Sequence, residues 1–369
     1  MIRMVSVFAL GLLAGVVLLV RLPALPEAVS AVGTATPETS FVPVTVPGVP
    51  DLPFEMDGDV KVFHLTAEKV IRKFRDPSDP GGGTREILTL GYNGSMPGPT
   101  IQVMEGDHVR IHFTNNWTMP TTVHWHGIEL PNNMDGGSSM TQELVEPGGS
   151  YTYEFTLHQN AGTYMYHSGH MQAYQVGMGS SGFFIIHPRA SRLPKVDKDF
   201  AFMLQIWSLP PHGNVPSTAS MSFNYFTMNG MTGPDIPHMT VKQGEQVRIR
   251  LANLSMMSHP IHIHGFTFDV TDMGGGFLPP HLRWPTNTMS INAGETRAVE
   301  LTAHTPGKWM FHCHFLHHIM NDMEFLPIPG QPHQMSHGEG MFTMLHVLKP
   351  GEMPGTGGHP GHGMAETDS

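Results

Sequence analysis

The stretch TIQVMEGDHVRIHFTNN (residues 100–116) returns in altered form as HMTVKQGEQVRIRLANL (residues 238–254). Each copy has an apolar strand pattern, a turn at a glycine, a second strand pattern and an asparagine. Downstream, GTYMYHSGH (residues 162–170) is matched by GKWMFHCHF (residues 307–315). An internal repeat of about 140 residues indicates two copies of one domain.

Short apolar alternations broken by Gly, Pro and Asn fill most of the chain, with no long amphipathic helix pattern between them. Strands of this length and spacing predict an all-β protein made of two β-sandwiches. We expect one domain over residues 56–190 and the second over residues 198–349. A linker (residues 32–55) precedes them, and a Gly/Pro/His-rich tail (residues 350–369) is expected to be disordered.

The first 31 residues have the pattern of an export signal. Arg3 supplies a positive charge, residues 7–20 form an apolar run, and small residues lead to a cleavage site near Ala31. An uncleaved membrane anchor fits the same residues, because the run is nearly long enough to span a bilayer. In both cases we expect the folded part to work outside the cytoplasm, in the periplasm or the extracellular space.

Histidine and methionine are unusually frequent, with 25 and 28 residues in a chain of 369. Imidazole and thioether groups favour copper over most other metals, although core packing also explains many methionines. The net charge of −11 and the lack of a Lys/Arg cluster argue against a nucleic-acid partner. The single cysteine, Cys313, excludes an intrachain disulfide.

Four groups of histidines occupy equivalent positions in the two repeats. They are HWHG (His124, His126), HSGH (His167, His170), HPIHIHG (His259, His262, His264) and HCHFLHH (His312, His314, His317, His318). Residues two apart on a strand face the same side, so an H-x-H pair points both imidazoles one way. In HCH, Cys313 must point the opposite way, so that one strand serves two metal sites.

These four groups, in this order, resemble the copper-binding signatures of the multicopper oxidases, and the likeness runs over about residues 60–348. Because only two domains are present and the cysteine lies in the second, the chain is most similar to the two-domain, or small, laccases. The resemblance implies two cupredoxin-like Greek-key β-sandwiches. It also implies the one-electron oxidation of a small reducing substrate, such as a phenol, coupled to the four-electron reduction of O2 to water.

Position by position, the resemblance implies four coppers per catalytic unit. The type 1 copper would be held by His259, Cys313, His318 and, as a weak axial ligand, Met323. The type 2 copper would be held by His124 and His262, and the type 3 pair by His126, His167, His170, His264, His312 and His314. Independently, two histidines, a thiolate and a distant thioether are the ligands of an electron-transfer copper site.

Three further positions carry open questions. Asp135 in NNMDG stands where the family keeps an acid near the type 2 copper, and O2 reduction consumes protons; an Asp-Gly pair also suits a plain turn. HSGH has one residue more than H-x-H, so His167 and His170 point the same way only if Gly169 permits a bulge or turn. His317 stands where some relatives carry an acid, and the resemblance gives it no role.

Other copper proteins share some of these features. Copper nitrite reductase shares the two-domain architecture but needs a cysteine in the first domain, which has none. A copper-storage protein does not need histidine pairs in strand register. Within the oxidases, Cu(I) and Mn(II) compete with phenols, since a type 1 site exposed at its His318 edge would accept electrons from many donors. Some involvement of Cu(I) is favoured by the methionines Met221, Met228, Met231, Met256 and Met257.

The resemblance finally implies a homotrimer. A trinuclear cluster in the family takes eight imidazoles, and here each domain supplies four. Two-domain laccases pair the first domain of one subunit with the second domain of the next, and this contact closes into a ring of three.

Overall fold

The computed structural model describes residues 41–76, 83–190, 195–321 and 340–353. Strands dominate these residues. The helical elements among them are short: α1 (Gln172–Gln175), α2 (Leu316–Met320) and the 3-10 turns η1 (Asn132–Met134) and η2 (Pro280–Leu282). The all-β prediction is confirmed, while the predicted export signal and almost all of the predicted tail lie outside the described residues.

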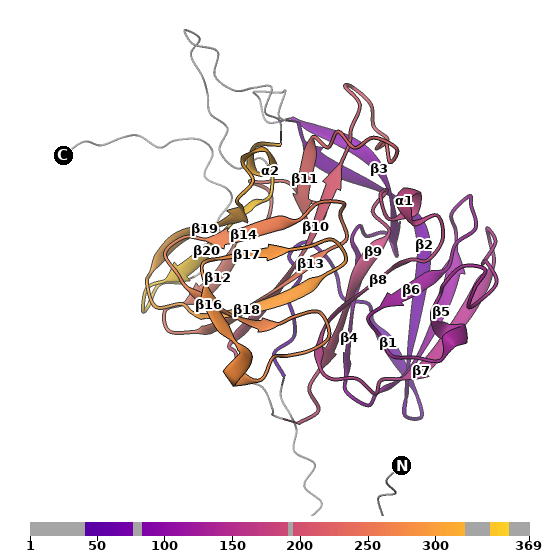
Figure 1. Ribbon diagram of the computed structural model, residues 1–369, viewed down its shortest axis with the longest axis horizontal. Coiled ribbons are helices and arrows are strands. Elements are labelled where there is room, and N and C mark those ends of the chain that lie inside the picture. The colour runs from indigo at the N-terminus through magenta and orange to yellow at the C-terminus, as the bar shows by residue number, and fades with distance from the viewer. Residues whose placement is uncertain (1–40, 77–82, 191–194, 322–339, 354–369) are drawn as a thin grey trace, which may run out of the picture. The chain divides into compact units, whose positions relative to one another are not determined.

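The strands before residue 190 form two sheets (Figure 1). The first runs β1 (Phe54–Asp57), β2 (Val60–Arg75), β5 (His108–Asn115), β7 (Ser150–Thr156), and β3 (Thr84–Tyr92) also pairs with β2. The second runs β4 (Gly98–Met104), β9 (Ser181–His187), β8 (Gly162–Ser168), β6 (Val123–His126). Strand alternation buries Val109, Ile111 and Phe113 of β5 in a core shared with Trp125 and Phe184 of the other sheet.

The strands from residue 198 onward form another two sheets. One runs β11 (Tyr225–Met228), β10 (Lys198–Trp207), β13 (Gln246–Asn253), β18 (Thr296–Thr302), β15 (Phe268–Asp272), β16 (Trp284–Thr286). The other runs β12 (Met239–Lys242), β20 (Phe342–Leu348), β19 (Gly307–Cys313), β14 (His259–Ile263), β17 (Thr288–Ile291). Their inward faces share a second core, in which Cys313 packs with Ile261 and Phe311.

The sequence repeat is also a structural repeat. The repeated stretches become β4–β5 and β12–β13, each joined through a glycine in the left-handed region, Gly106 (φ 78°) and Gly244 (φ 90°). β4 pairs in parallel with β9, and β12 pairs in parallel with β20. Among the described strands no ladder joins the halves; an isolated bridge, Thr45 to Phe200, does. The exact domain limits stay a prediction.

The two sandwiches are joined by packing and by a long hairpin. Val44 and Val46, from the stretch predicted to be a linker, are buried between β8–β9 and β10–β13 because their side chains are apolar. The hairpin β2–β3 extends from the first sandwich onto the second. There Arg72 donates to the carbonyl oxygen of Gly230 at 3.2 Å, and Arg75 pairs with Asp235 at 2.7 Å.

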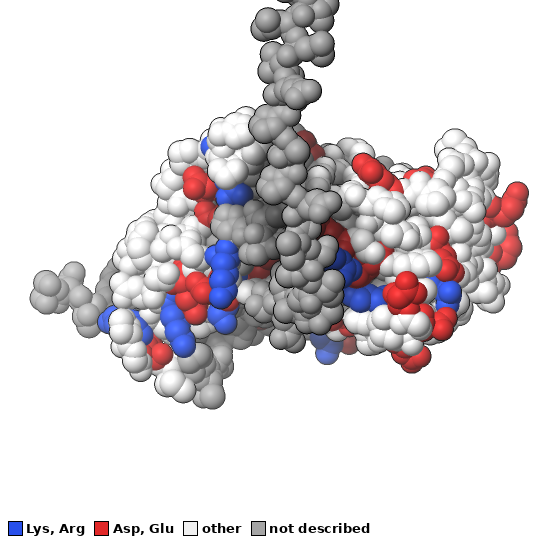
Figure 2. Space-filling view, turned by 90° about the horizontal axis from the view of Figure 1, so that it is seen from below, with Lys and Arg blue, Asp and Glu red and all other residues white. Residues whose placement is uncertain are grey.

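Charged side chains of both signs are mixed on the molecular surface. On the face in Figure 2, Lys and Arg stand next to Asp and Glu, and much of the remaining described surface is uncharged. Arg110, for example, pairs with Glu154 and Asp57, each at 2.7 Å. In the part of the chain that the structure describes, no helix has the length and apolar character needed to cross a membrane.

Candidate metal centres

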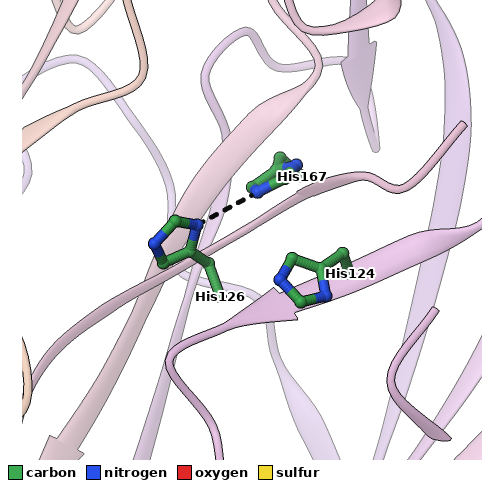
Figure 3. A group of neighbouring side chains, drawn as sticks. All are labelled: His124, His126 and His167. Atoms are coloured by element: carbon green, nitrogen blue, oxygen red, sulfur yellow. Dashed lines mark hydrogen bonds between the residues drawn. The ribbon is translucent and has the colours of Figure 1, made fainter. Parts of the chain in front are cut away.

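The first histidine set (His124, His126 and His167) gathers at the end of β6. Alternation along β6 turns His124 and His126 to one side and buries Trp125 in the core on the other. Antiparallel pairing with β8 places His167 opposite His124. Figure 3 shows the three rings beside one another, and one nitrogen from each lies within 4.8 Å of the other two. Three imidazoles this close can share one ion.

Hydrogen bonds fix the orientation of these rings. Nδ1 of His124 lies 2.8 Å from the carbonyl oxygen of Asp135, and Nδ1 of His167 lies 2.9 Å from that of Ser168. A carbonyl accepts, so both rings carry their proton on Nδ1 and offer a bare Nε2. Burial lowers the pKa of His167 to about 3 and also lowers that of His126. His126 and His167 are therefore neutral, as metal ligands must be.

The second histidine set (His262, His264, His312 and His314) lies where β14 pairs with β19. His262 stands opposite His312, and ring centroids within the set are 5.0–5.6 Å apart. Nε2 of His264 lies 3.0 Å from Nε2 of His312. Carbonyl oxygens again hold the other nitrogen: Nδ1 of His262 lies 2.7 Å from that of Asn287, and Nδ1 of His312 lies 2.8 Å from that of Cys313.

The thiol site (Cys313, His259 and His318) lies on the opposite side of β19. Sγ of Cys313 is 3.2 Å from Nδ1 of His318 and 3.8 Å from Nδ1 of His259, and these nitrogens are 3.1 Å apart. Burial raises the pKa of the thiol to about 12, so that without a cation it stays protonated. A metal ion would stabilise the thiolate, and two imidazoles with one thiolate suit copper.

His318 is buried, so the expectation of a thiol site exposed at this edge is wrong. Its ring stacks on Phe226 at 4.1 Å between centroids and meets the edge of Phe315 at 5.1 Å. Phe226 belongs to β11, far away in the sequence, so the HCHFLHH motif gave no sign of this cover. Among the neighbouring side chains, Phe315 is exposed and His317 is half-buried.

A cavity of about 500 Å³ joins the first set to the edge of the thiol site. His126 and His167 line one part of it, and Ser255 lines another. The hydroxyl of Ser255 lies 2.8 Å from Nε2 of His259. The remaining wall is largely apolar and includes Trp207, Phe223, Met221 and Met256.

Not every predicted ligand is brought together. His170 lies outside the first set as defined by nitrogen spacing, and its Nδ1 lies 3.1 Å from Oγ of Ser138. Met323 lies outside the described residues. Among the described residues, no hydrogen bond or ring contact joins the first set to the second. The two sets are therefore separate groups in the described part of this chain, and their meeting in one eight-imidazole cluster stays a prediction.

Sequence reasoning missed the groups that orient the rings. The contact of His262 with the backbone carbonyl of Asn287 could not be predicted from the sequence, because every residue has a carbonyl. Ser255 did leave a signal. Both Trp117 and Ser255 donate their amide to the side chain of an asparagine two residues earlier, so they are equivalent positions of the repeat. At this position the first repeat has a tryptophan, while the second has a serine whose hydroxyl contacts His259.

Comparisons with known proteins agree with this geometry. One family model described as multicopper oxidase matches residues 77–191, and a second with the same description matches residues 207–326. The blue copper oxidase from Nitrosomonas europaea, a solved structure, is 30% identical with a TM-score of 0.63, over 78% of this chain and 85% of that one.

Two curated relatives are similar over shorter stretches. Laccase-9 of Arabidopsis thaliana is 30% identical over 231 residues, which are 58% of this chain and 38% of the relative. Copper resistance protein A of Pseudomonas syringae pv. tomato is 32% identical over 160 residues, which are 43% of this chain and 26% of the relative. The chain thus spans less than half the length of these relatives.

Proposed function

Because the chain belongs to the multicopper oxidase family, we propose that it couples the one-electron oxidation of a small reducing substrate to the reduction of O2 to water. The observation that carries the proposal is the arrangement around β19. Cys313 meets His259 and His318 on one side of the strand, and His312 meets the second set on the other. Adjacent residues of one strand thus serve two metal centres.

Copper is the cofactor of this family, and the donor sets described above fit it. When bound, it supplies the one-electron chemistry that these side chains lack. We assign His259, Cys313 and His318 to the type 1 ion, with Met323 as the axial ligand. We assign His124 and His262 to the type 2 ion, and His126, His167, His170, His264, His312 and His314 to the type 3 pair.

The proposed active form is a homotrimer, because each histidine set supplies only part of a cluster. In the second set His314 is exposed, and the neighbouring apolar side chains of Met310, Phe315 and Leu316 are 38%, 40% and 63% exposed. Exposed apolar groups beside exposed ligands suit a surface that another subunit covers. The first set of one chain would then meet the second set of the next.

Two electron donors are candidates, an organic phenol and Cu(I). The apolar wall of the cavity suits a phenol ring. However, Met221 and Met256, which line the same cavity, are 66% and 68% exposed, and thioethers bind Cu(I). One relative is named for copper resistance. A steady-state comparison of a phenol, Cu(I) and Mn(II) as donors to O2 tests the proposed activity and ranks these donors.

Changing Met221 and Met256 together to leucine should raise the KM for Cu(I) about tenfold, equivalent to about 1.4 kcal/mol, and leave that for a phenol nearly unchanged. Leucine keeps the apolar volume and removes the sulfur. Met56→Leu is the control, since this exposed methionine lies on β1. Equal KM values for Cu(I) in the double variant and the wild type would leave these methionines with a packing role.

Asp135 is proposed to supply protons. Its carboxylate oxygen Oδ1 lies 3.5 Å from Nδ1 of His124. Asp135→Asn keeps the shape and the backbone carbonyl but cannot exchange a proton, so turnover with O2 should fall about 100-fold. Anaerobic bleaching of the blue absorption by substrate should keep its rate. Asp269→Asn, at an exposed aspartate, is the control. Equal turnover across pH in variant and wild type would leave only the turn role for Asp135.

Export is the last part of the proposal. It rests on the apolar run at residues 7–20 and the small residues near Ala31. Sequencing the N-terminus of protein recovered from the native host distinguishes a cleaved signal from a retained anchor.

A further inference from the structure

Gln175, the last residue of α1, is fully buried in spite of its polar side chain. Its Oε1 accepts hydrogen bonds from Oγ1 of Thr121 at 2.8 Å and from the hydroxyl of Ser168, and its Nε2 donates to the carbonyl oxygen of Pro120 at 2.9 Å. We infer that Gln175 is a positioning residue that fixes the HSGH turn, and with it His167 and His170. The inference rests on the proposed function.

The turn needs such support because the chain leaves the strand within the motif. β8 ends at Ser168, and Met171 has a left-handed backbone (φ 43°), which is unusual for a residue with a side chain. Oγ of Ser168 lies 2.9 Å from the carbonyl oxygen of His170 and 3.3 Å from its amide nitrogen. Because the hydroxyl of Ser168 donates its one proton to Gln175, it holds the backbone of His170 by accepting a hydrogen bond from this amide.

The opposite side of the turn is closed by the loop after Asp135. A Cβ atom on Gly169 would overlap the carbonyl oxygen of Gly136, so only glycine fits there. That carbonyl also accepts a hydrogen bond from Thr122 at 2.6 Å, while Nδ1 of His170 meets Ser138. The turn is thus held between this loop and α1.

The turn explains how HSGH can have one residue more than H-x-H. A regular strand would point His167 and His170 to opposite sides. The turn, fixed through Ser168 and Gln175, replaces the strand as the element that sets the direction of His170. Nδ1 of each ring is bound, to the carbonyl of Ser168 and to the hydroxyl of Ser138, so Nε2 is the nitrogen that each ring would offer to a metal; Nε2 of His167 lies 3.2 Å from Nδ1 of His126.

A purely structural role for Gln175 makes a different prediction. If its hydrogen bonds only stabilised the fold, their loss would lower the melting temperature and leave copper binding unchanged in the protein that remains folded. The thiol site provides an internal reference, because all of its described ligands lie in the second half of the chain.

The test uses Gln175→Leu, which keeps most of the volume and removes the hydrogen bonds. Gln205→Leu is the matched control, because Gln205 is also a buried glutamine and its amide binds the sulfur of Met96. Copper per chain, copper affinity by competition with a chelator, and the blue absorption are measured for each full-length variant. In Gln175→Leu we expect copper outside the thiol site to bind about 10- to 100-fold more weakly, with the blue absorption per folded chain unchanged. Gln205→Leu should keep both properties.

Ser168→Ala keeps the test decisive if Gln175→Leu does not fold. It breaks the link from Gln175 to His170 and should cause the same selective loss. If both single variants fold, the double variant should lose no more copper affinity than either single variant, since both changes act through one turn.

Wild-type copper affinity in Gln175→Leu, or an equal loss of affinity in Gln205→Leu, would overturn the inference and leave the proposed function standing. A wild-type protein without copper outside the thiol site would instead overturn the proposed function.

Discussion

Changing Cys313 to serine is expected to abolish the blue absorption of the oxidised protein and its substrate oxidation, while the fold is kept. The thiol lies 3.2 Å and 3.8 Å from the two imidazole nitrogens of its site, and sulfur is the donor that gives a type 1 copper both its colour and its electron-transfer role. Serine fills almost the same space in the core beside Ile261. The loss is therefore chemical, and no large cavity results.

Absorption spectra, copper content and turnover of the purified variant check this expectation. Copper at the two histidine sets should remain, because the second set lies on the other side of β19 and the first set lies on β6 and β8 of the other sandwich. Circular dichroism of the copper-free variant, compared with copper-free wild type, controls for folding. A blue band that survives in Cys313→Ser would remove this cysteine from the mechanism.

Mixing two inactive variants is expected to restore activity. His126→Ala damages the first set, and His264→Ala damages the equivalent position of the second, so each variant alone should be inactive. In a mixed ring of three, an intact first set can meet an intact second set from the neighbouring chain. Random assembly of equal amounts makes about one quarter of the contacts intact, so about a quarter of wild-type activity should return.

Both chains are to be purified without copper, mixed, unfolded and refolded together, and then supplied with copper. The control refolds each variant alone in the same way, and light scattering gives the mass of each product. Recovery should accompany a mass of three chains. A mixture no more active than its components would show that the cluster is built within one chain. The ring would then have no catalytic role.

The all-β fold and much of the candidate site could be predicted from the sequence, because both depend on local patterns. The repeat of residues 100–116 at 238–254 gave equivalent strand pairs. The alternation in HCH placed Cys313 opposite its neighbouring histidines. These results follow from the two-residue period of a strand, which tertiary contacts do not change.

Other features depend on contacts between distant segments, and the sequence did not reveal them. His318 is covered by Phe226, which lies 92 residues earlier, so the motif alone suggested an exposed edge. The direction of His170 depends on a turn that Gln175 and Gly136 hold from two sides. Val44 and Val46 looked like linker residues because their partners, such as Phe183 and Met203, lie more than a hundred residues away.

The hairpin β2–β3 has a consequence for the order of folding. Arg72 reaches Gly230 across 158 positions of the chain. During synthesis the hairpin leaves the ribosome long before the strands that it covers, and Phe74 must wait for Trp207, which it contacts at 5.3 Å between ring centroids. The chain loses conformational entropy when it closes the long loop, before the contacts that the loop brings together can stabilise the fold. Long-range contacts of this kind therefore slow folding. The first half of the chain thus reaches its final packing only when most of the second half has been made.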